Sequence, residues 1–195
     1  MNNIDKIQQF IESINMSLKQ DNYFSAIIVS LILPDICSKI EYNDIQRTTK
    51  RYKKWISEYM QPTLDSKVSN IKYLTPENIY ELRCSMVHEG TSNPSNQKGF
   101  KKDIDTSTEL DELIPYVNSV GWEAIAFANS QIHGSNKYKN SLFVDIDYFC
   151  NQIIKSVEYW ISSWDNKDEL NNLQVDLFSI AYAMMNEDKV LIFKP

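Results

Sequence analysis

Residues 82–90, LRCSMVHEG, are the one stretch of this sequence in which a histidine lies close to an arginine. The Arg83 guanidinium is suited to stabilise negative charge that builds up on a phosphate group. His88 would lie in the last turn of a helix, where the helix dipole favours the imidazolium form that a general acid requires. The stretch therefore predicts a centre for phosphate chemistry, with Arg83 and His88 as its candidate catalytic residues.

A straight α-helix does not bring these two side chains together. A separation of five residues turns them apart by roughly 140° and shifts them by about 7.5 Å along the axis. Tyr80, Cys84 and His88 share a face instead, and Ser85 lies beside them. Joint action of Arg83 and His88 thus requires a loosened helix end at His88, or a second copy of the helix alongside.

Two other interpretations of this stretch stay open. A histidine near a helix C-terminus commonly caps carbonyl groups, and an arginine one turn earlier is commonly a solvated charge. Cys84 and His88, at positions i and i+4, would also permit a thiol enzyme, although no third orienting group is evident.

Four helices are predicted in the first half of the chain. Apolar residues at three- and four-residue steps predict helices over 3–20 and 48–60. A nearly all-apolar helix begins near Tyr23, and Pro34 should kink or end it.

The fourth helix carries LRCSMVHEG and has the best-marked ends. Thr75 is a good N-cap, Pro76 suits the first helical position, and Gly90 is a natural left-handed stop. Beyond it, residues 91–112 are polar and are predicted to form a surface loop.

The second half of the chain adds a small β-element to a mainly α fold. Residues 121–144 are predicted to form a β-hairpin, with His133 in its turn. Asp145 should then cap a long helix, and a last helix is expected over 168–185 before a short strand, VLIFKP. No internal repeat or linker is visible, so residues 1–195 are predicted to form one helical domain with the hairpin as an insertion.

The composition limits what such a domain does. A net charge of -6 argues against coating a nucleic acid along the whole surface. The three cysteines form no CxxC pair, which indicates buried thiols and neither disulfides nor zinc. No secretion signal is visible and the most apolar run is too short to span a bilayer, so we expect a soluble cytoplasmic protein. We also expect that it needs no metal and no cofactor.

Residues 47–55 hold five basic side chains against this acidic background. They are candidates for phosphate contacts, with Tyr52 and Trp55 available to stack on bases. The alternative is a solvated helix face whose two aromatic side chains point into the core. The candidate RNA-binding residues are Arg47, Lys50, Arg51, Lys53 and Lys54, with Lys98, Lys101 and Lys102 as an extension.

Paired carboxylates occur at two places, Asp35 with Glu41 and Asp145 with Asp147. Neither pair has a matching set of histidines or cysteines. We interpret them as helix caps and surface charges in preference to a metal site.

Three strings together, LPDICSKIE (33–41), RYKKWISEYM (51–60) and IYELRCSMVHEG (79–90), resemble a bacterial and plasmid-borne branch of the HEPN superfamily. The Arg-x4-His spacing of Arg83 and His88 is similar to the Arg-x(4–6)-His motif of that superfamily. The resemblance runs from about residue 23 to 90 and extends more weakly over the hairpin and the helix after Asp145. It implies a HEPN-like helical bundle.

Many HEPN proteins are metal-independent endoribonucleases, and others are inactive partners or binding modules. In active members two protomers pair so that both motifs line one cleft. By position, Arg83 would stabilise the phosphorane-like state and His88 would act as acid or base, with Cys84, Ser85, Glu89 and Tyr80 as supporting residues. The family usually has a polar residue where Cys84 stands.

The resemblance therefore implies a homodimer that acts on RNA, in a bacterial toxin–antitoxin or defence setting with a cognate partner. The alternative is a non-catalytic interaction protein of the antitoxin or immunity type, for which the acidic charge would suit a basic partner.

Overall fold

The structure, a computed structural model, describes most of the chain. The described residues are 2–91, 112–128, 141–173, 182–185 and 191–194. For residues 127–128, 182–185 and 191–194 the structure describes the backbone alone. The predicted loop over 91–112, its Lys98, Lys101 and Lys102, and the hairpin turn with His133 lie almost entirely outside these residues.

The described part of the chain is mainly helical, which confirms the predicted fold class at that level. Its α-helices are α1 (Asn3–Lys19), α2 (Tyr23–Glu41), α3 (Thr48–Trp55), α4 (Pro76–Cys84), α5 (Ile146–Ser162) and α6 (Lys167–Asn172). Two π-helical turns, Ile56–Met60 and Ser85–Glu89, directly continue α3 and α4. Short 3-10 turns occupy Gln61–Thr63 and Ile71–Tyr73.

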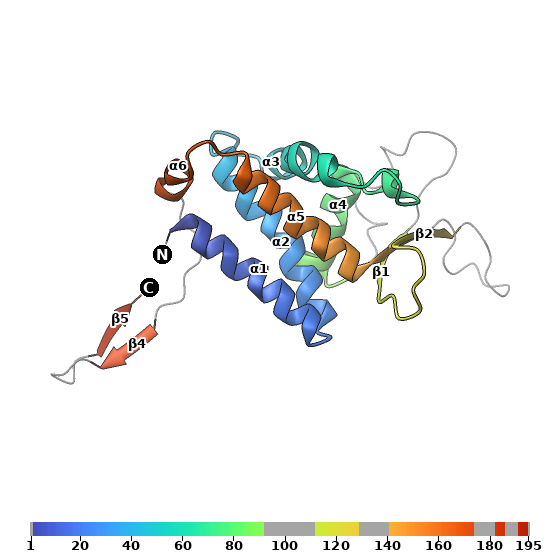
Figure 1. Cartoon of the computed structure of the whole chain (residues 1–195), viewed down its shortest axis with the longest axis horizontal. Helices are drawn as coiled ribbons and strands as arrows, with labels where there is room; N and C mark the ends of the chain where they lie inside the picture. The colour runs from blue at the N-terminus through green and yellow to red at the C-terminus, as the bar shows by residue number, and fades with distance from the viewer. Residues whose placement is uncertain (1, 92–111, 129–140, 174–181, 186–190, 195) are drawn as a thin grey trace.

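Helix α2 is the centre of the bundle. It packs against α1, α3, α4 and α5, and Figure 1 shows α1 and α5 running alongside it. Among the described helices only α2 is long and apolar enough to span a membrane, and half of that apolar window is buried inside the bundle. The core closes where Trp55 of α3 meets Trp160 of α5, both fully buried, with ring centroids 6.4 Å apart.

Pro34 does not end α2, so the prediction that the helix could stop there is wrong. The helix continues to Glu41, although Pro34 has no N–H to donate to the preceding turn. The buried Tyr52 hydroxyl donates to the Leu31 carbonyl in that turn at 3.1 Å. A side chain of α3 thereby supports the part of α2 that proline weakens.

The predicted hairpin is confirmed, and a third strand joins it. Strand β2 (Ile125–Ala128) pairs antiparallel with β3 (Ser141–Asp145), with Ile125 opposite Val144. Strand β1 (Glu112–Tyr116) adds in parallel on the other side of β3, giving the order β1-β3-β2. Strand β1 was not predicted, because the sequence before it is polar and because Pro115 lies within it. An edge strand tolerates a proline.

The last predicted helix, over 168–185, is confirmed at its start and wrong at its end, and residues 174–181 lie outside the described part of the chain. Helix α6 ends at Asn172, and Tyr182–Met185 is a strand, β4, which pairs antiparallel with β5 (Leu191–Lys194), the strand predicted in VLIFKP. The Asn3 amide donates to the carbonyls of Leu170 and Leu173, both at 2.9 Å. These bonds from α1 take up the carbonyl groups that a longer helix would use.

The ends of α4 match the capping prediction. The Thr75 hydroxyl accepts a hydrogen bond from the Asn78 N–H at 3.1 Å, and Pro76 takes the first helical position. Gly90 ends the π turn with a φ of 67°, a conformation that glycine adopts without strain.

We expect Thr75→Ala to lower the free energy of unfolding by about 1 kcal/mol, because the N-terminal amides of α4 lose their side-chain acceptor. Thr75→Ser keeps the hydroxyl and serves as the control. Urea denaturation monitored by circular dichroism measures the difference. Equal stability of the two variants would contradict this role of Thr75.

Candidate active site at the end of helix α4

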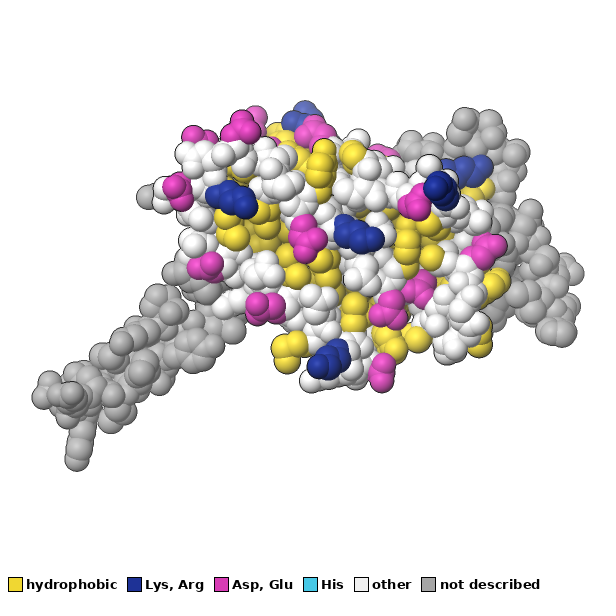
Figure 2. Space-filling model, viewed as in Figure 1, with side chains coloured by type: hydrophobic (Ala, Val, Ile, Leu, Met, Phe, Trp, Pro, Cys, Tyr) yellow, Lys and Arg dark blue, Asp and Glu magenta, His cyan; other side chains and the backbone are white. Residues whose placement is uncertain are grey.

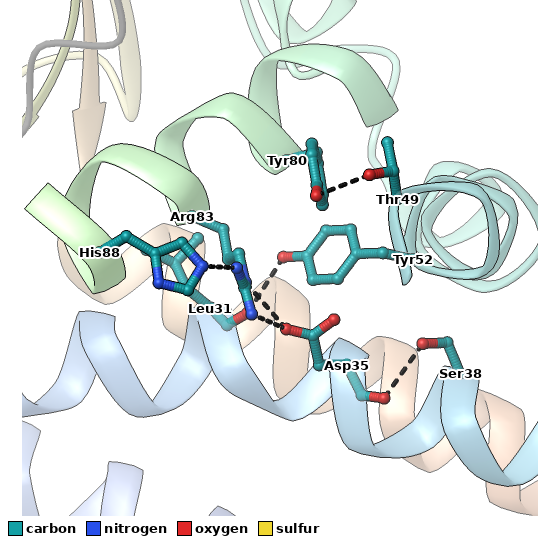
Figure 3. A network of polar contacts seen from close by, with 8 residues as sticks. All are labelled: Leu31, Asp35, Ser38, Thr49, Tyr52, Tyr80, Arg83 and His88. Carbon is teal, nitrogen blue, oxygen red and sulfur yellow. Dashed lines mark hydrogen bonds and ion pairs between the residues drawn. The ribbon is translucent and has the colours of Figure 1, made fainter. Parts of the chain in front are cut away.

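The π turn Ser85–Glu89 solves the geometric problem that a straight helix poses. A π-helix closes its hydrogen bonds between residues i and i+5 and therefore widens the turn. The Arg83 and His88 side chains consequently meet, and Arg83 Nη1 forms a hydrogen bond with His88 Nε2 (Figure 3). The loosened helix end that the sequence required is thus present within one chain.

This contact defines the hydrogen-bonding role of each His88 nitrogen. A guanidinium has donors and no acceptor, so Nε2 must accept and carries no proton in this arrangement. The neutral ring then carries its proton on Nδ1. His88 as a residue is exposed at the surface.

Asp35 of α2 holds the other side of the arginine. Its Oδ2 accepts from Arg83 Nε at 2.8 Å and lies 2.5 Å from Arg83 Nη2. The two side chains are only 14% and 13% exposed. Asp35, Arg83 and His88 therefore form one chain of contacts from the core helix to the surface (Figure 3).

Burial and charge act in opposite directions on this pair. Burial lowers the pKa of the Arg83 guanidinium, but Asp35 outweighs it, and the pKa of Arg83 is raised. Burial also raises the pKa of the Asp35 carboxyl, an effect that Arg83, Arg51 and His88 offset only in part. The short contacts favour the charged pair, because both Arg83 donors point at one carboxylate oxygen.

Arg51 links the basic helix to this site. Its charge lowers the pKa of Asp35, so the second guanidinium lies within electrostatic reach of the carboxylate. Arg51 makes one long hydrogen bond of 3.5 Å to the Gln46 carbonyl, while its Nε is buried without a partner. Arg51 is thus the candidate RNA-binding residue that is among the main electrostatic influences on Asp35.

Two lysines of α3, Lys53 and Lys54, are paired with carboxylates of the same chain and lie over aromatic rings. Lys53 Nζ lies 3.6 Å from Glu77 and 5.6 Å from the centroid of the Tyr80 ring. Lys54 Nζ lies 3.8 Å from Glu58 and 4.1 Å from the centroid of the Tyr42 ring. Arg47 and Lys50 are exposed.

The prediction that Tyr52 and Trp55 of α3 could stack on bases is wrong. Tyr52 and Trp55 are fully buried, as the alternative interpretation required. Tyr52 packs edge-on against Tyr80 with ring centroids 5.4 Å apart, and burial raises its pKa well above the usual value. The fully buried Tyr52 and Trp55 rings therefore present no face to a ligand.

The predicted supporting residues have other partners. The Tyr80 hydroxyl bonds with Thr49 at 2.7 Å, and Figure 3 shows it directed toward α3 and away from His88. The buried Ser85 hydroxyl donates to the Glu81 carbonyl at 3.1 Å. Neither side chain orients His88 in this arrangement, and Glu89 is exposed at the end of the π turn.

A Cys84–His88 dyad is not formed in the described part of the chain. The Cys84 side chain interacts with Tyr80 and Arg83, whereas His88 contacts Arg83. The arrangement therefore favours phosphate chemistry by Arg83 and His88 over thiol chemistry.

Sequence reasoning missed Asp35. It interpreted Asp35 as a cap or surface charge, but Asp35 is largely buried and paired with an arginine 48 residues away. The signal in the sequence was a carboxylate placed directly after a proline, next to the apolar run of residues 26–33. A charge at such a position requires a partner.

Glu41, its predicted companion, belongs to a separate pocket. Its carboxylate accepts from the Tyr59 hydroxyl at 2.9 Å and from Trp160 Nε1 at 2.7 Å. Glu41 and Tyr59 help to line an open pocket of about 400 Å³, whose other lining residues are Ser163, Trp164, Asp165, Asn166 and Glu169.

Across the described residues, no group of three or more His, Cys, Asp and Glu side chains is arranged to hold a metal ion. No protein-family model matches this chain, and neither a curated protein nor a solved structure is significantly similar to it. The Asp35–Arg83–His88 arrangement therefore has to be interpreted from its own chemistry.

We expect one of the three thiols to react rapidly in the folded protein. Cys37 and Cys150 are buried, and burial raises their pKa, that of Cys150 to about 12. Cys84 is partly exposed. Labelling with a chromogenic disulfide at pH 8 should show a single fast phase.

Cys84→Ser should abolish that phase, while Cys37→Ser should leave it intact. Two or three fast-reacting thiols in the native protein would contradict the burial of Cys37 and Cys150.

Proposed function

We propose that this chain is a HEPN-like endoribonuclease that cleaves RNA without a metal ion, with Arg83 and His88 as its catalytic residues. The observation that carries the proposal is the contact between Arg83 and His88 across the π turn. It places a permanent cation beside a group that transfers protons near neutral pH, the pair that phosphodiester cleavage requires.

In the proposed reaction the ribose 2′-oxygen attacks the adjacent phosphorus as its proton leaves to a base. The bond from phosphorus to the 5′-oxygen then breaks, and an acid donates a proton to that oxygen. Arg83 stabilises the additional negative charge on the phosphoryl oxygens. Once Arg83 has turned to the phosphate and freed Nε2, His88 serves as the base, or in its protonated form as the acid, giving a 2′,3′-cyclic phosphate and a free 5′-hydroxyl.

One histidine cannot be base and acid at the same moment. A second copy of this chain would bring a second Arg83–His88 pair to the same phosphate and supply the missing proton-transfer group. We therefore propose a homodimer as the active form, in agreement with the resemblance to HEPN proteins. The bacterial cytoplasm and a toxin–antitoxin or defence role, with a cognate partner, rest on that resemblance alone.

A second candidate function is binding of a basic partner without catalysis. The observation that favours it is the Glu41 pocket, which also carries Asp165 and Glu169. On the face shown in Figure 2, acidic side chains lie among separate lysines and arginines, and no continuous basic surface for nucleic acid is visible there.

We expect Arg83→Ala and His88→Ala each to reduce RNA cleavage at least about a hundredfold, because each removes one half of the catalytic pair. Cleavage of a mixed-sequence fluorogenic RNA in the presence of EDTA measures this loss. Lys155→Ala, which removes an exposed positive charge from α5, is the charge control and should cleave normally. Normal cleavage by both site variants, or no cleavage of any RNA by the native protein, would overturn the enzyme proposal in favour of the binding function.

Arg51 and Lys54 should differ although they share a helix. Arg51→Gln should weaken RNA binding about tenfold and lower the salt dependence by about one phosphate contact, because its charge acts on the Asp35 carboxylate of the site. Lys54→Gln should have little effect, since Lys54 is already paired with Glu58. Fluorescence anisotropy with a labelled RNA over a range of salt concentrations makes the comparison, and equal losses would contradict it.

A further inference from the structure

We propose that Asp35 is an internal competitor for phosphate: it occupies the Arg83 guanidinium in the resting site, and a phosphate binds by displacing it. The inference deepens the proposed function and rests on it for the identity of the phosphate, a phosphodiester of RNA. It assigns to Asp35 a regulatory role distinct from that of the catalytic pair.

The first argument is the occupancy of the guanidinium. An arginine binds phosphate in a two-pronged manner through the edge formed by Nε and Nη2 or through the edge formed by Nη1 and Nη2. Asp35 already takes Nε and Nη2, and His88 takes Nη1. Each edge therefore includes an atom that is engaged within the chain, so phosphate must exchange with an existing partner.

The second argument is that Asp35 is poorly satisfied. A single oxygen, Oδ2, makes both contacts with Arg83, while Oδ1 is buried and has no hydrogen-bond partner. A buried carboxylate oxygen without a donor is costly, in keeping with the raised pKa of Asp35. A partner held in this way is easier to displace than a fully hydrogen-bonded one.

The third argument is that the remaining cation beside Asp35 is also incompletely paired. Arg51 acts electrostatically on Asp35, and its buried Nε has no partner. Arg83 contacts this carboxylate directly, and the charge of Arg51 acts on it as well. A phosphate provides more acceptor oxygens than Asp35 and would satisfy donors that the carboxylate leaves unpaired.

The consequence is a gain of binding on removal of the carboxylate charge. Asp35→Asn keeps the shape of the side chain but weakens its hold on Arg83. We expect this variant to bind inorganic phosphate about tenfold more tightly than the native protein, the effect of removing one charge-assisted competitor. If Asp35 only positioned Arg83, the same variant would bind phosphate equally well or less well.

The test is a titration of the full-length protein with inorganic phosphate, followed by the imidazole resonances of His88 in NMR spectra. Asp44→Asn, at an exposed position, makes the same change in net charge and should bind like the native protein. Adding Arg83→Ala to Asp35→Asn should abolish the gain. Thermal unfolding verifies that each variant is folded, and Asp35→Ser replaces Asp35→Asn if the latter does not fold.

Tighter binding by Asp35→Asn alone supports the inference. Unchanged or weaker binding, or an equal gain in Asp44→Asn, overturns it. The outcome is independent of catalysis, because the titration contains no RNA. If Asp35→Asn binds phosphate more tightly while no variant cleaves RNA, the competitor role stands and the nuclease proposal fails. If the native protein cleaves RNA but Asp35→Asn does not bind phosphate more tightly, the nuclease proposal stands and the competitor role fails.

Discussion

The ion pair between Asp35 and Arg83 connects the core of this protein to its candidate chemistry. Asp35 lies on α2, the helix against which α1, α3, α4 and α5 pack, and Arg83 lies on α4 just before the π turn. Because the pair is mostly buried, the position of the guanidinium depends on the packing of α2 against α4. The imidazole of His88 in turn depends on that guanidinium. A disturbance of the bundle core would therefore reach the exposed histidine through two contacts.

The π turn is the second requirement, and it explains why the site is at the end of a helix. Within a regular α-helix the side chains of Arg83 and His88 would diverge, whereas the wider turn lets them meet. The turn ends at Gly90, whose left-handed conformation stops the helix directly after Glu89. The Tyr52 and Tyr80 rings pack edge-on against each other between α3 and α4. Local backbone irregularity and core packing together produce the arrangement.

Much of the frame could be predicted from local chemistry. Thr75, Pro76 and Gly90 marked the ends of the helix that carries the site, and two apolar runs on either side of a polar, turn-prone segment marked the hairpin. Helix α6 was overextended because the bonds that end it come from Asn3, at the opposite end of the chain. Asp35 could not be assigned to the site for a related reason: spacing along a sequence shows which side chains share a helix face, but not which helices pack together. The π turn has no comparable sequence signal.

The claim that Arg83 and His88 form one unit within a single chain is tested most directly by the tautomer of His88. Long-range proton–nitrogen NMR spectra distinguish the two ring nitrogens, and His133→Gln identifies the His88 signals. At a pH where the ring is neutral, we expect the proton on Nδ1 with Nε2 unprotonated, and a shift toward the Nε2-protonated form in Arg83→Ala. A ring protonated on Nε2 in the native protein, unchanged by Arg83→Ala, would contradict the Arg83–His88 contact.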